Sequence, residues 1–90
     1  MSIILSDIPE TVRIDKALSI LNFLKKELSV EDLRLNEEDC NWFGPALTLE
    51  FNAEIYVWSF QSEDTLYTVR MTALYHDSQV IEMQIIPSKV

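Results

Sequence analysis

The fold is decided by residues 55–75, which read IYVWSFQSEDTLYTVRMTALY. Aromatic and β-branched residues fill the two ends of this stretch and alternate in a way that is typical of strands with one buried face. Residues 61–64 interrupt the pattern with polar side chains, which indicates a four-residue loop. The stretch therefore predicts two antiparallel strands, at about 54–60 and 65–75.

Two further strands are predicted on either side, at about 46–51 and 79–86. Residues 52–53 are taken as the first hairpin loop and residues 76–78 as the last. The expected cross-strand partners are Leu47 with Trp58, Leu49 with Tyr56, Phe51 with Glu54, Trp58 with Tyr67, Tyr56 with Val69, Ala73 with Ile81, and Met71 with Met83. Because Ala53 resists the positive φ of a type I′ turn, one long bent strand over 46–60 is the alternative.

The three predicted loops, at residues 52–53, 61–64 and 76–78, all place the same side chains on one buried face. A one-residue slip in any of the hairpins would divide these side chains between the two faces. The predicted buried face consists of Leu47, Leu49, Phe51, Tyr56, Trp58, Phe60, Tyr67, Val69, Met71, Ala73, Tyr75, Ile81, Met83 and Ile85. A helix is expected to cover it.

That helix is predicted near the N-terminus. Asp7 and Glu10 have the spacing of a capping box, and Pro9 between them suits a first helical turn. Apolar residues then recur every three or four positions to about Leu28. The stripe expected to face the sheet is Leu18, Leu21, Leu24 and Leu28.

The segment between helix and sheet is mostly polar. Residues 29–39 are expected to form a connector with a helical turn or a short edge strand. Residues 41–45 read NWFGP, and the Gly44-Pro45 pair favours a turn. The predicted class is thus α+β, with residues 1–90 as a single domain: one N-terminal amphipathic helix on one face of a four-stranded antiparallel meander.

The opposite face of the sheet is too apolar for a surface that meets only water. Two interpretations remain open: either residues 3–5 and 30–40 fold over it, or it is a dimer or partner surface. The apolar side chains of this possible dimer face are Ile55, Val57, Leu66, Leu74, Val80 and Ile86.

The net charge of −8 comes almost wholly from the second part of the chain. Residues 1–34 carry six acids and five bases, whereas residues 35–90 carry nine acids and two bases. Such a field repels nucleic acid and anionic membranes and favours encounter with a basic protein. Ordinary solubility is the simpler explanation of the same charge.

Few features of the sequence favour catalysis. Gly44 is the only glycine, so no phosphate-binding loop is expected, and the only histidine, His76, falls in a predicted turn. The only cysteine, Cys40, lies beside carboxylates that raise a thiol pKa. We expect a protein without catalytic activity, metal site or cofactor, in the cytoplasm.

The candidate binding site is the segment 37–43, in which three carboxylates precede two adjacent aromatic residues. Such aromatic anchors ringed by charge are typical of interface hot spots. An extended segment cannot point both aromatic side chains into one core, so one is expected at the surface beside the carboxylates; alternatively, Trp42 caps the core and Phe43 packs under the helix. The candidate partner-binding residues are Glu37, Glu38, Asp39, Trp42, Phe43, Glu63 and Asp64.

Two functions fit these features. The first is a non-catalytic acidic protein that binds and neutralises a basic protein, as an immunity protein, an antitoxin or an inhibitor of a nucleic-acid-binding protein does. The second is a homodimeric structural or chaperone-like module that uses the apolar sheet face.

Overall fold

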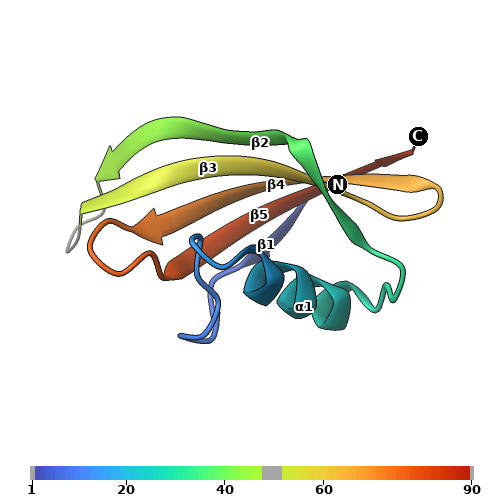
Figure 1. Cartoon of the computed structure of the whole chain (residues 1–90), viewed down its shortest axis with the longest axis horizontal. Coiled ribbons are helices and arrows are strands. Elements are labelled where there is room, and N and C mark those ends of the chain that lie inside the picture. Colours follow the sequence, from blue (N-terminus) through green and yellow to red (C-terminus); the bar gives the residue numbers. More distant parts are fainter. Residues whose placement is uncertain (1, 48–51, 90) are drawn as a thin grey trace.

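The computed structural model describes residues 2–47 and 52–89. Within these residues the chain forms one α-helix and one five-stranded antiparallel sheet in the order β1-β5-β4-β3-β2 (Figure 1). The elements are β1 (Ile3–Leu5), α1 (Ala17–Leu28), β2 (Arg34–Leu47), β3 (Asn52–Gln61), β4 (Thr65–Leu74) and β5 (Val80–Lys89). The α+β class is confirmed, but the prediction of four strands was wrong, because residues 3–5 pair with β5 as an additional edge strand.

The helix is shorter than predicted and begins at Ala17 instead of near Asp7. Arg13 instead forms an isolated bridge with Gln79, flanked by hydrogen bonds from the Ile14 N–H to the Ser78 carbonyl at 2.8 Å and from the Val80 N–H to the Val12 carbonyl at 3.0 Å. Val12 and Ile14 are β-branched, and such side chains lose rotamer freedom in a helix. The capping-box prediction at Asp7 and Glu10 was therefore wrong.

A serine inside the helix organises its start. The Ser19 hydroxyl accepts a hydrogen bond from the Arg13 N–H at 3.1 Å and donates to the Lys16 carbonyl at 2.6 Å. The predicted end at Leu28 is confirmed. There Ser29 adopts the left-handed conformation, and the Val30 N–H donates to the Lys25 carbonyl, as in a Schellman motif.

The helix also faces the sheet differently from the prediction. Its fully buried residues are Ile20 and Leu24, and Leu18 is 67% exposed. Leu21 and Leu28 flank the buried stripe and are half-buried. The predicted stripe was thus right for Leu24 and wrong for Leu18, because at 3.6 residues per turn Leu18 lies about 120° around the helix axis from Leu24, whereas Ile20 lies only about 40° away.

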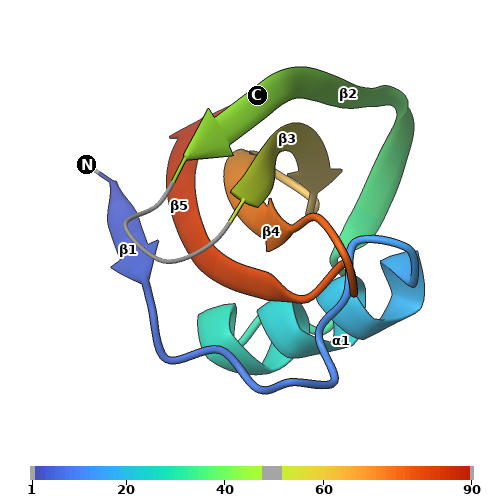
Figure 2. The same ribbon diagram turned by 90° about the vertical axis from the view of Figure 1, so that its left-hand side faces the viewer.

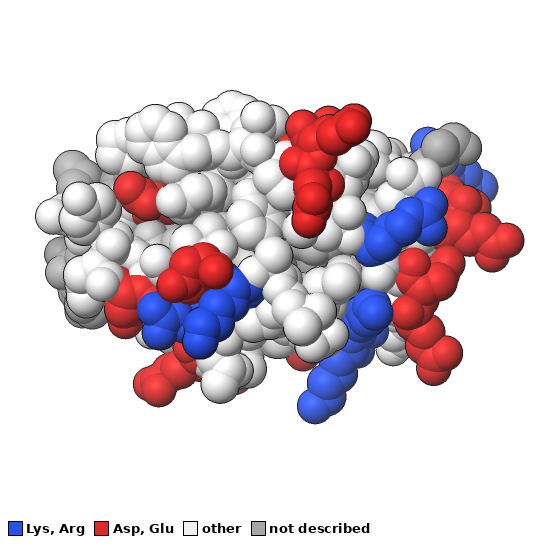
Figure 3. Space-filling view, viewed as in Figure 1, with Lys and Arg blue, Asp and Glu red and all other residues white. Residues whose placement is uncertain are grey.

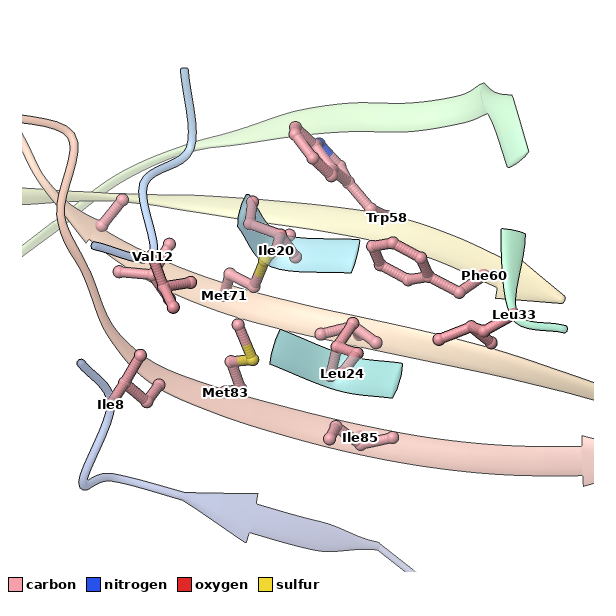
Figure 4. Packing of buried hydrophobic residues seen from close by; sticks show 13 residues of the cluster. Ile8, Val12, Ile20, Leu24, Leu33, Trp58, Phe60, Met71, Met83 and Ile85 are labelled. Atoms are coloured by element: carbon pink, nitrogen blue, oxygen red, sulfur yellow. The ribbon is translucent and has the colours of Figure 1, made fainter. Parts of the chain in front are cut away.

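The hairpin registers differ in detail from the predictions but keep the same face buried. Trp58 lies opposite Val69 instead of Tyr67, a shift of two residues, so Trp58 and Tyr67 remain on one side of the sheet. Met71 faces Met83 as predicted. The core packs between this face and α1 (Figures 2 and 4), and its buried members are Ile8, Val12, Ile20, Leu24, Leu33, Trp58, Phe60, Val69, Met71, Ala73, Val80, Met83 and Ile85.

A bulge between β4 and β5 changes one predicted pair. The register shifts between Thr72 and Ala73, so Ala73 lies opposite Val80 instead of Ile81. The shift turns Val80 into the core, where it is fully buried, and leaves Ile81 half-buried. The prediction that Val80 belongs to the opposite face was therefore wrong. Tyr75, expected in the core, follows the end of β4 and is 68% exposed.

The first hairpin also differs from the prediction. Residues 52–53 belong to β3 instead of a loop, and Leu47 pairs with Asn52. Because β2 and β3 are antiparallel neighbours, the alternative of one bent strand over 46–60 was wrong as well. The predicted positions of Leu49 and Phe51 lie outside the described residues.

Candidate functional site

The segment that was expected to be a connector and a turn is one long edge strand, β2, with two bulges. The first lies between Asn36 and Asn41, which face Ser59 and Val57 on β3. The second lies between Trp42 and Gly44. The turn predicted at residues 41–45 was wrong: an edge strand tolerates glycine and proline at a bulge, and Gly44 has a φ of 131° there.

The first bulge carries three exposed carboxylates, those of Glu37, Glu38 and Asp39. Figure 3 shows an acidic group that projects over the middle of β2. The Asn36 side-chain amide donates to Asp39 Oδ2 at 2.7 Å, and the Asn41 amide donates to the Asp39 carbonyl at 3.4 Å. These two bonds hold the bulge in place and leave the carboxylates of Glu37 and Glu38 directed to solvent.

Cys40 lies at the C-terminal end of the first bulge, on the side that faces the core. It is half-buried against the core, and its thiol lies 3.8 Å from the Asn36 carbonyl, to which it donates. Burial, followed by the charges of Glu37 and Asp39, raises the pKa of the Cys40 thiol. A raised pKa keeps the thiol protonated near neutral pH, so this cysteine is suited to packing and is a poor nucleophile.

The second bulge exposes two adjacent aromatic side chains. Trp42 is 57% exposed and Phe43 is 69% exposed. The alternative in which Trp42 caps the core and Phe43 packs under the helix was wrong. In both ribbon views α1 lies away from the C-terminal half of β2, so it cannot cover them (Figures 1 and 2).

The underside of β2 rests on Trp58 of β3. Trp58 is 9% exposed, and its side chain points toward the β2 ribbon (Figure 4). Its ring centroid lies 6.5 Å from that of Phe60, with a tilt of 42° between the rings. These two aromatic residues connect the bulged strand to the core.

The outer edge of β2 is unsuited to pairing with another strand. Two bulges, Pro45 and the charges of residues 37–39 are the devices by which proteins block edge-to-edge pairing. A partner at this edge therefore meets side chains, above all Trp42 and Phe43, in place of a row of free backbone groups.

Tyr56 lies beside this surface, opposite Trp42 in the register. Its hydroxyl donates to Glu54 Oε2 at 2.7 Å. Burial, followed by the hydrogen bond and charge of Glu54, raises the pKa of Tyr56 to about 12. Because the folded state holds this proton more tightly than the unfolded chain, the contribution to stability is present below pH ~10 and is lost as pH rises through about 12.

Glu54→Gln is expected to lower the pKa of Tyr56 but to leave it above the ordinary value, because burial is the largest cause of the shift. Alkaline absorbance titration of the folded protein measures this pKa, and a parallel titration of Tyr56→Phe assigns the signal. An unchanged pKa in the Glu54→Gln protein would contradict the hydrogen bond.

Glu63 and Asp64 lie in the β3–β4 turn, at the end of the molecule where Arg34 faces Gln61. The Glu63 N–H donates a hydrogen bond to Asp32 Oδ2 at 3.1 Å. The Thr65 hydroxyl donates to Asp64 at 3.1 Å. The prediction missed Asp32, since no sequence pattern joins positions that are 31 residues apart.

The carboxylates of residues 37–39 and those of Glu63 and Asp64 form two separate acidic groups on the surface. The bulge faces β3 between Ser59 and Val57, and the turn begins beyond Gln61, so the groups follow one another along the same side of the molecule. Figure 3 shows the second group toward the end that carries the β3–β4 hairpin. Glu63 and Asp64 therefore extend the acidic field without touching the aromatic pair.

The possible dimer face is only partly as expected. Val80 is fully buried in the core, and Leu74 is 8% exposed. Ile55, Val57 and Leu66 are half-buried, and Ile86 is 43% exposed. The proposed covering of this face was wrong, since residues 3–5 and 34–47 are the two edge strands of the sheet.

Features of other classes of site are scarce in the described part of the chain. Residues 2–47 and 52–89 contain no cluster of three or more His, Cys, Asp or Glu side chains placed to ligate a metal ion. The only helix found there, α1, has 12 residues and is too short to span a bilayer. His76 is exposed in the β4–β5 turn.

Comparisons with protein-family models, with curated proteins and with solved structures gave no match to this chain.

Proposed function

We propose that this protein is a non-catalytic binding protein that engages a basic protein partner through the β2 surface. We define the β2 surface as the three carboxylates of residues 37–39 together with Trp42 and Phe43. The observation that supports the proposal is the exposure of two adjacent aromatic side chains beside three exposed carboxylates on one strand.

Each part of this surface has a physical role in the proposal. Exposed aromatic side chains bury much apolar area at little cost in conformational entropy, which makes them the usual anchors of an interface. The carboxylates, added to a net charge of −8, attract a basic partner and raise the rate of association. Neutralisation of a basic toxin or of a nucleic-acid-binding protein is the biological role that this chemistry fits.

Absence of catalysis is part of the proposal. It is supported by the raised pKa of the Cys40 thiol and by the position of His76 in an exposed turn. Among the described residues, neither side chain has a hydrogen-bonded acid or base beside it of the kind that nucleophilic catalysis requires.

Replacement of both aromatic anchors, Trp42→Ala with Phe43→Ala, is expected to weaken binding of the partner at least ~10-fold, because hot-spot truncations cost more than about 1 kcal/mol each. The partner is captured from a lysate of the source cells on immobilised protein, identified by mass spectrometry, purified and titrated. Charge reversal of Glu37, Glu38 and Asp39 to Lys is expected to lower mainly the association rate and its salt dependence.

Matched controls separate these effects from general ones. Tyr75→Ala removes an aromatic side chain that is 68% exposed, follows the end of β4 and is not part of the β2 surface. Conversion of Asp7, Glu10 and Glu27 to Lys makes the same change of net charge on other exposed positions. Binding that survives the Trp42 and Phe43 substitutions, or that all variants lose equally, would rule out the β2 surface.

A further inference from the structure

The face of the sheet opposite α1 is continuous across four strands. Residues directly opposite each other in the register lie on the same face, so the partners of Val57 and Ile55 define it. No described segment packs over it as a layer, since every described strand lies in the sheet and α1 covers the other side. This outer face comprises Ile4 of β1; Glu82, Gln84, Ile86 and Ser88 of β5; Leu66, Thr68, Arg70, Thr72 and Leu74 of β4; and Ala53, Ile55, Val57, Ser59 and Gln61 of β3.

The outer face is partly apolar, and its charge differs from that of the rest of the surface. Ile4 is 66% exposed and Ile86 is 43% exposed, with Gln84 next to both of them. Of the other apolar side chains of this face, Ile55, Val57 and Leu66 are half-buried, and Ala53 and Leu74 are buried. The chain as a whole carries 15 acids and 7 bases. On the outer face a single acid, Glu82, stands against a single base, Arg70, so this face is the place where two copies of an acidic protein repel each other least.

Arg70 and Glu82 also have the placement that a twofold contact requires. Arg70 faces Gln84 and Thr72 faces Glu82, so the two charged residues are diagonal neighbours on adjacent strands, and both are exposed. The ion pair found among residues 2–47 and 52–89 joins Arg13 to Asp15, which leaves Arg70 and Glu82 without a charged partner there. A twofold axis that runs between them brings Arg70 of each copy to Glu82 of the other, twice per dimer.

We propose that the outer face is the interface of a homodimer, in which two copies pack sheet against sheet and exchange Arg70–Glu82 ion pairs. This inference goes beyond the proposed function, because it uses the opposite side of the sheet from α1 and none of the residues of the β2 surface.

The area of the face suits a weak homodimer. Strands lie ~4.8 Å apart and rise ~3.4 Å per residue, so each outward residue covers about 33 Å². Ala53 and Leu74 are already buried within the chain, and the remaining residues, about thirteen, cover roughly 430 Å². Two copies then bury roughly 900 Å², the size of a weak, transient interface. Twisted sheets of this kind pack face to face at an angle of about −30°.

The test uses two charge reversals that repel within their own dimers and attract each other. Arg70→Glu and Glu82→Arg are each expected to weaken the homodimer at least ~10-fold, because each places like charges together twice per dimer. An equimolar mixture of the two variants is expected to restore a dimer of wild-type mass, because both contacts then join opposite charges. Light scattering and sedimentation of the whole chain from roughly 1 μM to 1 mM measure the masses.

The control variants are measured by the same light scattering and sedimentation. Lys26→Glu and Glu27→Arg make equal charge changes on exposed positions of α1 and are expected to leave dimerisation unchanged. Far-ultraviolet circular dichroism checks that each variant is folded, and restoration in the mixture requires folded chains in any case. A wild-type chain that stays monomeric at every concentration, single reversals that dimerise like the wild type, or a mixture that stays monomeric would each overturn the proposal.

Failure of this inference and failure of the proposed function are distinguishable. The Trp42 and Phe43 substitutions are expected to leave the dimer intact, and the Arg70 and Glu82 reversals are expected to leave capture of a basic partner intact. If an acidic protein occupies the outer face in place of a second copy, the purified chain is monomeric, and the homodimer is ruled out.

Discussion

Phe60→Ala is expected to destabilise the protein by about 3–5 kcal/mol, the range measured for truncation of buried aromatic side chains. Phe60, with 0% exposure, is the largest fully buried side chain among residues 2–47 and 52–89, and it lies between Trp58 and Leu33 (Figure 4). A domain of this size has a total stability of roughly 5–13 kcal/mol. Urea unfolding monitored by circular dichroism is therefore expected to show a large fall in the midpoint, or a chain that is unfolded without denaturant.

Phe43→Ala provides the matched control for this prediction. The same atoms are removed, but Phe43 is 69% exposed. We expect its unfolding free energy to stay within about 0.5 kcal/mol of the wild type. Equal losses in the two variants would contradict the core described above.

Gly44→Ala is expected to cost about 1–3 kcal/mol through backbone strain alone. Gly44 has a φ of 131°, a conformation that residues with a Cβ rarely adopt. A Cβ built at this position meets no heavy atom within 4 Å, so steric overlap adds nothing to the cost. Urea unfolding measures the loss, and tryptophan emission reports whether the second bulge has rearranged beside Trp42.

Pro45→Ala is the control for the bulge. Pro45 is exposed and adjacent in the chain, and its replacement is expected to change the stability by less than about 0.5 kcal/mol. A Gly44→Ala protein as stable as the wild type would show that the strand relaxes to a negative φ at this position.

The buried face of the sheet could be predicted because a register error of two residues leaves every side chain on the same face of its strand. Trp58 pairs with Val69 and not with Tyr67, yet both partners lie on the same side. An error of one residue exchanges the faces, and this happened at Val80, where the bulge after Thr72 adds a residue to β5. Bulges have no reliable sequence signature in this chain, so Val80 and Ile81 were exchanged.

The N-terminal segment could not be predicted for a different reason. The apolar residues at positions 8, 12 and 14 fit a helical period, and their side chains do contribute to the core. The segment that brings them there is not helical, because turns and a bridge between Arg13 and Gln79 take the place of helical hydrogen bonds. The choice depends on a contact 66 positions away along the chain, which local pattern does not contain.

The β2 surface was recognised by composition, but its exposure was not predictable. Gly44-Pro45 indicated a turn, and the pairing of Trp42 with Tyr56 shows that the strand continues through it. Whether both aromatic side chains meet solvent depends on how far α1 reaches across the sheet. That reach was predicted wrongly, because the predicted helix began near Asp7 and the observed one begins at Ala17.

The contrast between Trp58 and Trp42 has an optical consequence. The chain contains two tryptophans, one 9% and the other 57% exposed. The shielded indole emits at shorter wavelength and is protected from iodide, whereas the solvated one emits further to the red and is quenched by it. The molecule thus carries two built-in fluorophores, of which one records loss of tertiary structure and the other records events at its surface, without any attached dye.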